Sequence, residues 1–248
     1  MKSIILILRG HLRAWGGMSL GDNRDTQLYP TASALIGFLG ACAGIDRNDV
    51  NCLNMWYQSW DCMSLSAHRD GISLPELMWD FQTAKDSLNT SGVRVQEAVI
   101  SYRGYLQETA DIASLTLRPH AEESLLDRAL IGVREPVFTP YLGRLCNPLS
   151  ALPWLPGEDI AVEGEATAVA EAMIDRLGKV RVELLGKDEE ENGAKAPGWK
   201  AALIAPSGWL DRTWPKGKFA YRKGVPDQRL GALLSYGQRM VDVFHVQI

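Results

Sequence analysis

Arginines gather near the start of the chain, around a loop that is rich in glycine. The segment from Arg9 to Gly17 reads Arg-Gly-His-Leu-Arg-Ala-Trp-Gly-Gly and contains both Arg9 and Arg13. A third arginine, Arg24, follows in a polar stretch. A guanidinium group donates paired hydrogen bonds to phosphate oxygens, and glycine lets the backbone approach a ligand closely. The residue types and their spacing therefore favour phosphate binding, with the N–H groups of Gly16 and Gly17 as further donors.

Aromatic residues extend this prediction. Trp15 lies inside the glycine-rich loop, where it could stack on a nucleic-acid base or fill the core beneath the loop. The later segment Tyr141-Leu-Gly143-Arg144 is a second candidate. Its tyrosine could stack or donate a hydrogen bond, its glycine permits a close approach, and its arginine could hold a phosphate. The alternative for this segment is a structural turn after Pro140.

The glycine-rich loop must be positioned by the segments on either side of it. Residues 4–8 are a continuous apolar run, so we expect a buried strand over residues 3–9. After the loop we expect a helix over residues 31–43, opened by Pro30 or Thr31 and closed by Gly44. Its predicted buried stripe consists of Leu35, Phe38, Leu39 and Cys42. A second face carries only small side chains and would let another backbone approach closely; it consists of Ala34, Gly37 and Ala41.

Strand and helix patterns alternate over the rest of the first 150 residues. We expect strands over residues 60–67, 72–81 and 112–118, the last of them half-buried, and a helix over residues 121–131. Residues 82–103 are polar and contain the turn signal Asn89-Thr-Ser-Gly92, which predicts a projecting hairpin. This order indicates an α+β fold with a ferredoxin-like (RRM-type) sheet and an inserted hairpin.

The patterns are weaker beyond Pro148. We expect a helix over residues 166–177, a strand over residues 180–185 and an acidic exposed loop over residues 187–195. Residues 1–150 should form the main domain, and residues 151–248 a smaller α/β portion packed on it, with no independent fold. Aromatic and basic residues interleave from Trp209 to Lys223, which suits either a nucleic-acid or protein contact or a surface hairpin.

Two blocks of this sequence resemble the CasD family, the fifth-family CRISPR-associated subunit of type I-E Cascade. The first block is an apolar strand running into Ala14-Trp-Gly16, then the Arg24 loop, then Pro30-Thr31 and Leu39-Gly-Ala-Cys42, with Gly44-Ile-Asp-Arg47 and Asp49 behind it. The second block is Phe138-Thr-Pro-Tyr-Leu-Gly-Arg144 with Cys146 and Pro148-Leu149. The resemblance covers residues 1–150 and fades afterwards.

The resemblance implies a fold and a function. In this family the hairpin is a thumb that grips CRISPR RNA (crRNA) and packs on the neighbouring backbone subunit, a role carried here by residues 82–103. It implies a non-catalytic subunit that holds the 5′ handle of the crRNA and caps the Cascade backbone next to the large subunit. The RNA-binding residues we expect are Arg9, Arg13, Trp15, Gly16, Gly17, Arg24, Thr31, Ser33, Lys85, Arg94, Arg103, Tyr141, Gly143 and Arg144.

A catalytic alternative stays open, because some type I-C relatives cut precursor crRNA without a metal, using Tyr, Lys and His. That chemistry needs a base near the 2′-hydroxyl and a cation for the developing charge. His11, His68 and His120 are scattered in the sequence, and Gln82 stands where members of the family can carry His. The sequence contains no nucleotide-binding, metalloprotease or serine-hydrolase motif. We therefore expect no catalytic residues and no cofactor.

Composition narrows the class of protein. The 248 residues carry a net charge of −4, which excludes a generic RNA-binding patch but allows a few arginines to hold one RNA segment. No apolar run is long enough for a membrane span, and the N-terminus does not read as a signal peptide, so a cytoplasmic location is expected. The four cysteines, Cys42, Cys52, Cys62 and Cys146, make no zinc pattern and are expected to be free thiols, with Cys42 in the core.

Overall fold

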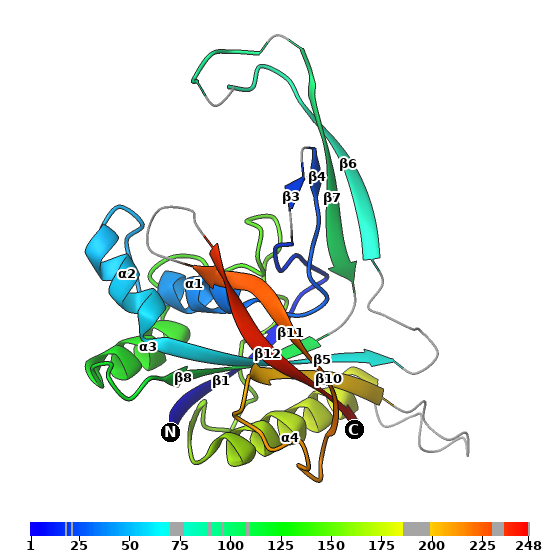
Figure 1. Ribbon diagram of the computed structural model, residues 1–248. Coiled ribbons are helices and arrows are strands. Elements are labelled where there is room, and N and C mark those ends of the chain that lie inside the picture. The colour runs from blue at the N-terminus through cyan, green and yellow to red at the C-terminus, as the bar shows by residue number, and fades with distance from the viewer. Residues whose placement is uncertain are drawn as a thin grey trace.

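The computed structural model of the chain describes residues 1–17, 19–20, 22–69, 77–88, 91–95, 97–107, 110–185, 199–229 and 236–247. In this part of the chain, a mixed α+β fold is built on a seven-stranded antiparallel sheet with the order β11-β12-β10-β5-β8-β1-β9 (Figure 1). Its strands are β1 (Lys2–Arg9), β5 (Trp60–Arg69), β8 (Ala110–Leu117), β9 (Ala161–Glu163), β10 (Trp199–Pro206), β11 (Lys218–Arg229) and β12 (Tyr236–Gln247). Strands from both halves of the chain therefore share one sheet.

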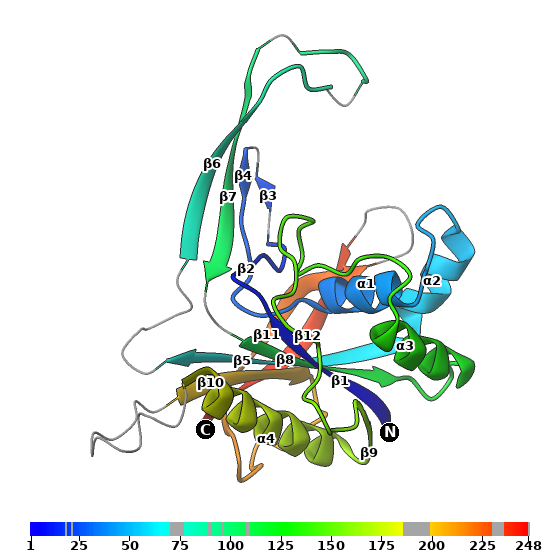
Figure 2. The same ribbon diagram turned by 180° about the vertical axis from the view of Figure 1, so that it is seen from behind.

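Helices cover both faces of this sheet. On one face lie α1 (Ala32–Cys42), α2 (Val50–Gln58) and α3 (Ser124–Arg134), and on the other lies α4 (Ala166–Leu185) (Figures 1 and 2). The central strand β1 is buried on both sides, since Ile4, Leu6 and Leu8 belong to the core under α1. Ile5 and Ile7 belong to the core under α4. This arrangement explains the continuous apolar run in the sequence.

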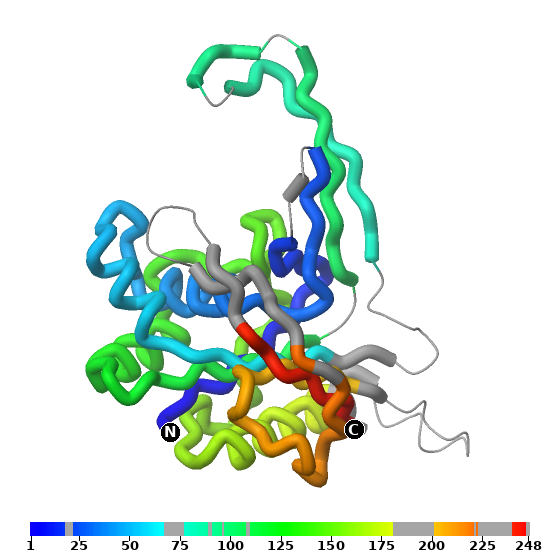
Figure 3. The backbone as a smooth tube through the Cα atoms, in the orientation of Figure 1, coloured from blue at the N-terminus to red at the C-terminus, as the bar shows by residue number. Residues whose placement is uncertain are grey.

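A second, smaller sheet stands out from the body. Strands β6 (Leu77–Ala84) and β7 (Val99–Gln107) pair in antiparallel fashion and project away from the main sheet, as the tube in Figure 3 also shows. Two short strands, β2 (Leu12–Arg13) and β4 (Asn23–Arg24), pair with the other edge of β7, and β3 (Ser19–Leu20) pairs with β4. The predicted hairpin at residues 82–103 therefore begins earlier and ends later in the structure.

The predicted boundaries of the first helix are confirmed. Thr31 is the N-cap of α1 and its hydroxyl accepts a hydrogen bond from the Ala34 N–H. Gly44, with φ +69°, follows the C-cap in the left-handed region that glycine tolerates. The four residues of the predicted stripe are buried. The neighbours of the small-sided face lie within the chain: the Tyr57 hydroxyl sits over Gly37, and the Phe138 N–H donates to the Ala41 carbonyl.

Two predictions of secondary structure were wrong. Residues 180–185 continue α4 instead of forming a strand, because Val169, Met173, Leu177 and Val180 recur at helical spacing and are all buried. The strand predicted at 112–118 was expected to be half-buried. In the structure β8 is buried along its whole length, since it is a central strand covered on both faces.

Other elements were not predicted. Helix α2 has Asp49 as its N-cap and buries only Leu53 and Trp56. Strands β10, β11 and β12 extend the main sheet with C-terminal residues whose pattern was too weak to read. The acidic loop predicted at residues 187–195 lies outside the described residues, as do residues 72–76 of the strand predicted at 72–81.

Candidate nucleic-acid interface

A buried carboxylate organises the loop that follows β1. Asp111, on β8, is fully buried and lies 2.8 Å from Nε of the equally buried Arg13. The same carboxylate accepts hydrogen bonds from Trp15 Nε1 at 2.9 Å and from the Ser66 hydroxyl at 2.6 Å. Because unpaired buried charges are costly, these three partners compensate the carboxylate and fix the loop on the sheet.

This burial corrects three of the expected RNA contacts. The side chains of Arg13 and Trp15 belong to the interior, and the indole N–H of Trp15 is already donated to Asp111. Thr31 is buried as well, because its hydroxyl caps α1 and donates to the Trp15 carbonyl at 3.0 Å. Ser33 is half-buried within 3.4 Å of that hydroxyl. Arg13, Trp15 and Thr31 therefore support the loop and present no side chain to a ligand.

The backbone of the same loop is held from two sides, and only one of its two glycines, Gly16, is left accessible. The Trp15 N–H donates to the Thr26 hydroxyl, and the Gly17 N–H donates to the Asp25 carbonyl at 3.1 Å. That bond occupies Gly17, so Gly17 has no free N–H for an anion. Gly16 is exposed and has φ +65°, with nothing within 4 Å of the position that a Cβ would occupy. Of the two glycines, Gly16 has the open approach.

Two arginines lie side by side at the base of the hairpin. Strand β4 pairs in parallel with β7, which sets Arg24 opposite Arg103 and Asn23 opposite Tyr102. Arg24 is exposed and Arg103 is half-buried, with its Nε 3.3 Å from the Ser101 hydroxyl. Residues that are 79 positions apart in the chain thus form one cationic surface.

Arg144 joins the second predicted block to this surface. Its two terminal nitrogens donate to the carbonyls of Gly104 at 3.0 Å and Arg24 at 2.8 Å. Its guanidinium lies 4.5 Å from the centroid of the Tyr105 ring, a cation–π contact. Arg144 therefore ties the strand of Arg24 to β7.

The glycine and tyrosine of this block are also placed by the fold. A Cβ on Gly143 would overlap the carbonyl of Ala14, and its φ is +86°, so this position requires glycine. The Tyr141 hydroxyl accepts a hydrogen bond from Arg47 at 2.9 Å. Arg47 is exposed and was missed as a candidate site residue. Nothing local in its sequence indicates this pairing, since the two residues lie 94 positions apart.

The remaining residues predicted to contact RNA lie apart from the cationic surface formed by Arg24 and Arg103. Arg9 is half-buried at the end of β1, where its carbonyl accepts from the Ser150 N–H. Lys85 is exposed beyond β6, and Arg94 is exposed 3.8 Å from Asp86. An ion pair so exposed contributes little, so Arg94 stays available to a ligand.

The aromatic and basic segment near the C-terminus proves to be largely structural. Trp214 is buried against the ring of Phe244, and Phe219 packs on the same ring. Arg222 forms a two-point ion pair with Asp242, at 2.6 Å and 3.0 Å. Trp214 and Phe219 therefore pack in the core, and residues 218–223 join the main sheet as part of β11.

Metal-ligand side chains and histidines are dispersed among the described residues. Among them, no three His, Cys, Asp or Glu side chains are grouped so that they could hold a metal ion. His11 and His120 are exposed in separate loops, and His68 lies in β5. Within the same part of the chain, no helix is long and apolar enough to cross a membrane.

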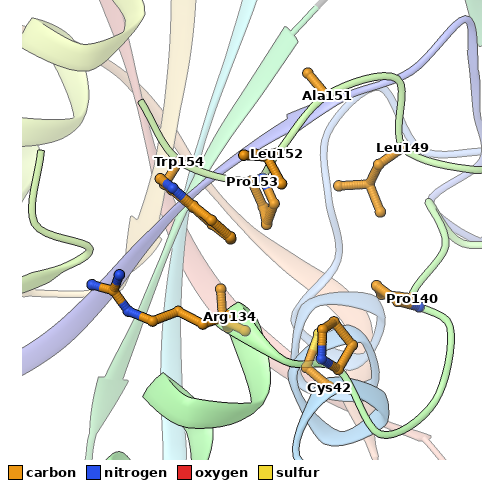
Figure 4. A pocket seen from close by; sticks show the side chains of 10 residues that line it. Cys42, Arg134, Pro140, Leu149, Ala151, Leu152, Pro153 and Trp154 are labelled. Carbon is orange, nitrogen blue, oxygen red and sulfur yellow. The ribbon is translucent and has the colours of Figure 1, made fainter. Parts of the chain in front are cut away.

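One pocket lies between the C-terminal ends of α1 and α3 and the segment 149–154 (Figure 4). Its lining is apolar except for Arg134, and consists of Cys42, Val133, Arg134, Pro136, Pro140, Leu149, Ala151, Leu152, Pro153 and Trp154. Burial raises the pKa of the Cys42 thiol to about 12, so this thiol is not a nucleophile near neutral pH.

Two solved structures resemble this chain over almost its whole length. A structure described as a CRISPR RNA-guided surveillance complex superposes with a TM-score of 0.60 at 20% identity, covering 99% of this chain and 90% of the other. A crystal structure of a Cas protein gives a TM-score of 0.59 at 24% identity, covering 99% and 95%. The chain therefore shares the fold of these two structures.

Sequence comparison gives the family. Residues 3–204 match the family described as CRISPR-associated protein (Cas_Cas5). The chain is also 34% identical over 154 residues to the CRISPR system Cascade subunit CasD of Escherichia coli (strain K12), which covers 59% of this chain and 67% of that protein. The protein belongs to the Cas5 family of CRISPR-associated proteins.

Proposed function

We propose that this protein is a non-catalytic crRNA-binding subunit of a type I-E Cascade complex, and that it holds the 5′ handle of the crRNA. The support from comparison is membership of the Cas5 family and the similarity to a Cascade subunit. Its partners would then be the crRNA, the Cascade backbone subunit and the large subunit.

One structural observation carries the RNA-binding part of the proposal. Arg24 and Arg103 lie side by side at the base of the projecting hairpin, and Arg144 fixes the strand of Arg24 to β7. Guanidinium groups held this way suit the phosphates of a short single-stranded segment. The overall charge of −4 does not oppose this function, because only the local charge meets the RNA.

We assign roles to the other exposed residues around this junction. Gly16 would let the RNA backbone pass close to the loop, and Lys85 and Arg94 would follow it along the hairpin. Tyr141 with Arg47 would form the edge of the same surface. Arg13, Trp15 and Thr31 would act only by supporting the loop.

The strand order also supports a finer description of the fold. The sequence β1-α1-β5-β8-α3-β9 with the spatial order β5-β8-β1-β9 is that of a ferredoxin-like sheet. We propose that this is the RRM-type core, that β6 and β7 form the thumb, and that the C-terminal strands extend the core.

The direct experiment incubates the purified full chain with labelled precursor crRNA in EDTA and measures both retention and cleavage. We expect retained, intact RNA, with weaker binding by Arg24→Glu and unchanged binding by the control Glu97→Gln, which removes an exposed charge from the distal hairpin. Specific cleavage within the repeat would instead support the alternative function, a metal-independent endoribonuclease that processes precursor crRNA. Loss of cleavage in His11→Ala or His120→Ala would then identify the catalytic base. Replacing residues 82–100 by a glycine linker should prevent assembly with crRNA; unchanged assembly would reject the role of the hairpin.

A further inference from the structure

The pocket between α1, α3 and the segment 149–154 takes no part in the proposed RNA surface. Its volume is about 190 Å³, which leaves room for one aromatic or branched aliphatic side chain, since an engineered apolar cavity of about 150 Å³ binds benzene. Leu152 in its lining is 56% exposed. Val137 and Phe138, which stand between two lining residues in the chain, are 64% and 50% exposed. A pocket within an exposed apolar patch is typical of a binding site.

The backbone fixes the shape of this pocket. The Val137 N–H donates to the Cys42 carbonyl at 3.0 Å, which holds one wall on the end of α1. The Ile7 N–H donates to the Pro153 carbonyl at 3.0 Å, which holds the other wall on β1. Prolines, whose φ is fixed by the ring, are frequent in the lining: Pro136, Pro140 and Pro153. A pocket that is already formed loses little conformational entropy when a partner binds.

Arg134 is the charged residue in the lining, and Figure 4 shows its side chain along one side of the pocket. The residue is exposed, and within the described part of the chain its guanidinium makes no ion pair. No acidic residue lines the pocket. A guanidinium at the edge of an apolar pocket is complementary to a carboxylate on the partner, and such a pair adds specificity to apolar burial.

We propose that this pocket receives one apolar side chain of another protein subunit of the complex, and that this subunit places an Asp or Glu next to Arg134. The apolar side chain fills the space between the two walls, as anchor residues do at protein interfaces. This inference rests on the proposed function and adds a docking site on a face that does not include the hairpin.

The position and charge of the pocket favour a protein as its occupant. RNA affinity depends on several cations near phosphates, and the lining provides one arginine. The chain runs from Pro140 in the lining directly to Tyr141 and Arg144 at the proposed RNA surface. A subunit docked in the pocket would therefore lie beside the RNA.

Charged substitutions at the pocket test the proposal. Leu152→Glu places a carboxylate at the apolar margin, and Arg134→Glu reverses the charge that is proposed to pair with the partner. Met240→Glu is the matched control, because Met240 is a similarly exposed apolar residue on β12, 49% exposed. The readouts are affinity of the isolated chain for single-stranded RNA with the handle, and incorporation when co-expressed with the other Cascade subunits and crRNA of the same genome. Melting temperature checks that each variant is folded.

We expect Leu152→Glu and Arg134→Glu to bind RNA within about twofold of the unmodified chain and to lose at least tenfold in incorporation, while Met240→Glu changes neither. Normal incorporation of both folded variants would overturn the proposal. A loss of RNA affinity as large as that of Arg24→Glu would also overturn it, because RNA would then occupy the pocket. If the unmodified chain neither binds the RNA nor incorporates, the proposed function itself has failed.

Cross-linking identifies the occupant. A photoreactive phenylalanine derivative in place of Leu152 should cross-link, in the assembled complex, to a protein segment in which an apolar residue stands within a few positions of an Asp or Glu. Reversing that carboxylate to Lys should restore incorporation of Arg134→Glu. A cross-link to RNA, to a second copy of this chain or to a segment without a carboxylate would overturn the proposal.

Discussion

The carboxylate of Asp111 lies 2.8 Å from the guanidinium of Arg13, and both side chains are completely buried between the main sheet and the loop after β1. The same carboxylate holds Trp15. A charged pair in the interior thus fixes the loop whose outer surface includes Gly16. Two of the residues expected to contact RNA, Arg13 and Trp15, thus lie one layer below the surface.

Removing the charge of Asp111 should destabilise the protein strongly. Asp111→Asn leaves the Arg13 guanidinium buried without a counter-ion, and breaking such a pair costs about 3–5 kcal/mol. Urea unfolding of this variant and of Arg13→Met measures the loss. The double variant should lose less than the sum of the two, because neither charge is then left unpaired. Exposed Glu97→Gln is the control. Additive losses would show that the two side chains are not coupled.

Gly143 should tolerate no side chain. Gly143→Ala combines a left-handed φ of +86° with overlap between the new Cβ and the Ala14 carbonyl. Gly92→Ala is the matched control, because φ is +74° there and the added methyl meets nothing within 4 Å. The control should lose about 1–2 kcal/mol of unfolding free energy from backbone strain alone, and Gly143→Ala clearly more. Equal losses would contradict the close approach of the two loops.

The Cys42 thiol should be protected from alkylation. Its pKa of about 12 follows from burial, so at pH 8 iodoacetamide should label the exposed Cys146 much faster. The raised pKa also predicts a pH effect on stability. Unfolded thiols ionise above about pH 8.5 while the buried thiol stays neutral, so stability should fall as pH rises from there towards 12. Cys42→Ala should reduce that fall, and rapid labelling of folded Cys42 would contradict its burial.

Asp242 should give the opposite pH dependence. The hydrogen bonds from Arg222, opposed by desolvation, lower the pKa of this carboxyl below its usual value. Its contribution to stability should be complete above the unfolded pKa of about 3.9 and should be lost as pH falls through the folded pKa. Asp242→Asn should therefore be less stable near neutral pH and show a weaker loss in acid. Parallel acid profiles for the two proteins would contradict the pairing.

Local pattern was enough to predict the elements around the site. The apolar run of β1 and the caps of α1 each depend on a few adjacent residues, and these predictions are confirmed. The α4 error came from reading Val180–Leu185 by itself, although its spacing continued that of Val169 and Met173.

The chemistry of individual side chains was harder to predict, because it depends on contacts between distant segments. The residue types favoured RNA contact for Arg13 and left Trp15 open between base stacking and the core. Nothing in the neighbouring sequence shows that Asp111 lies beneath them, 98 and 96 positions away. A carboxylate next to the apolar start of a strand, Asp111-Ile112-Ala113, was the one available signal of a buried partner. Which side chains of β6 and β7 share a side depends on the register of the two strands, which local sequence does not fix.

The most direct test of RNA binding by the hairpin junction is the salt dependence of binding. The full chain, Arg24→Gln and Arg103→Gln would each be titrated with single-stranded RNA carrying the handle across a range of salt concentrations. If each arginine neutralises one phosphate, each substitution should weaken binding and reduce the slope of log K against log salt by about 0.7. Affinities and slopes equal to those of the unmodified chain would show that this pair of arginines does not hold the RNA.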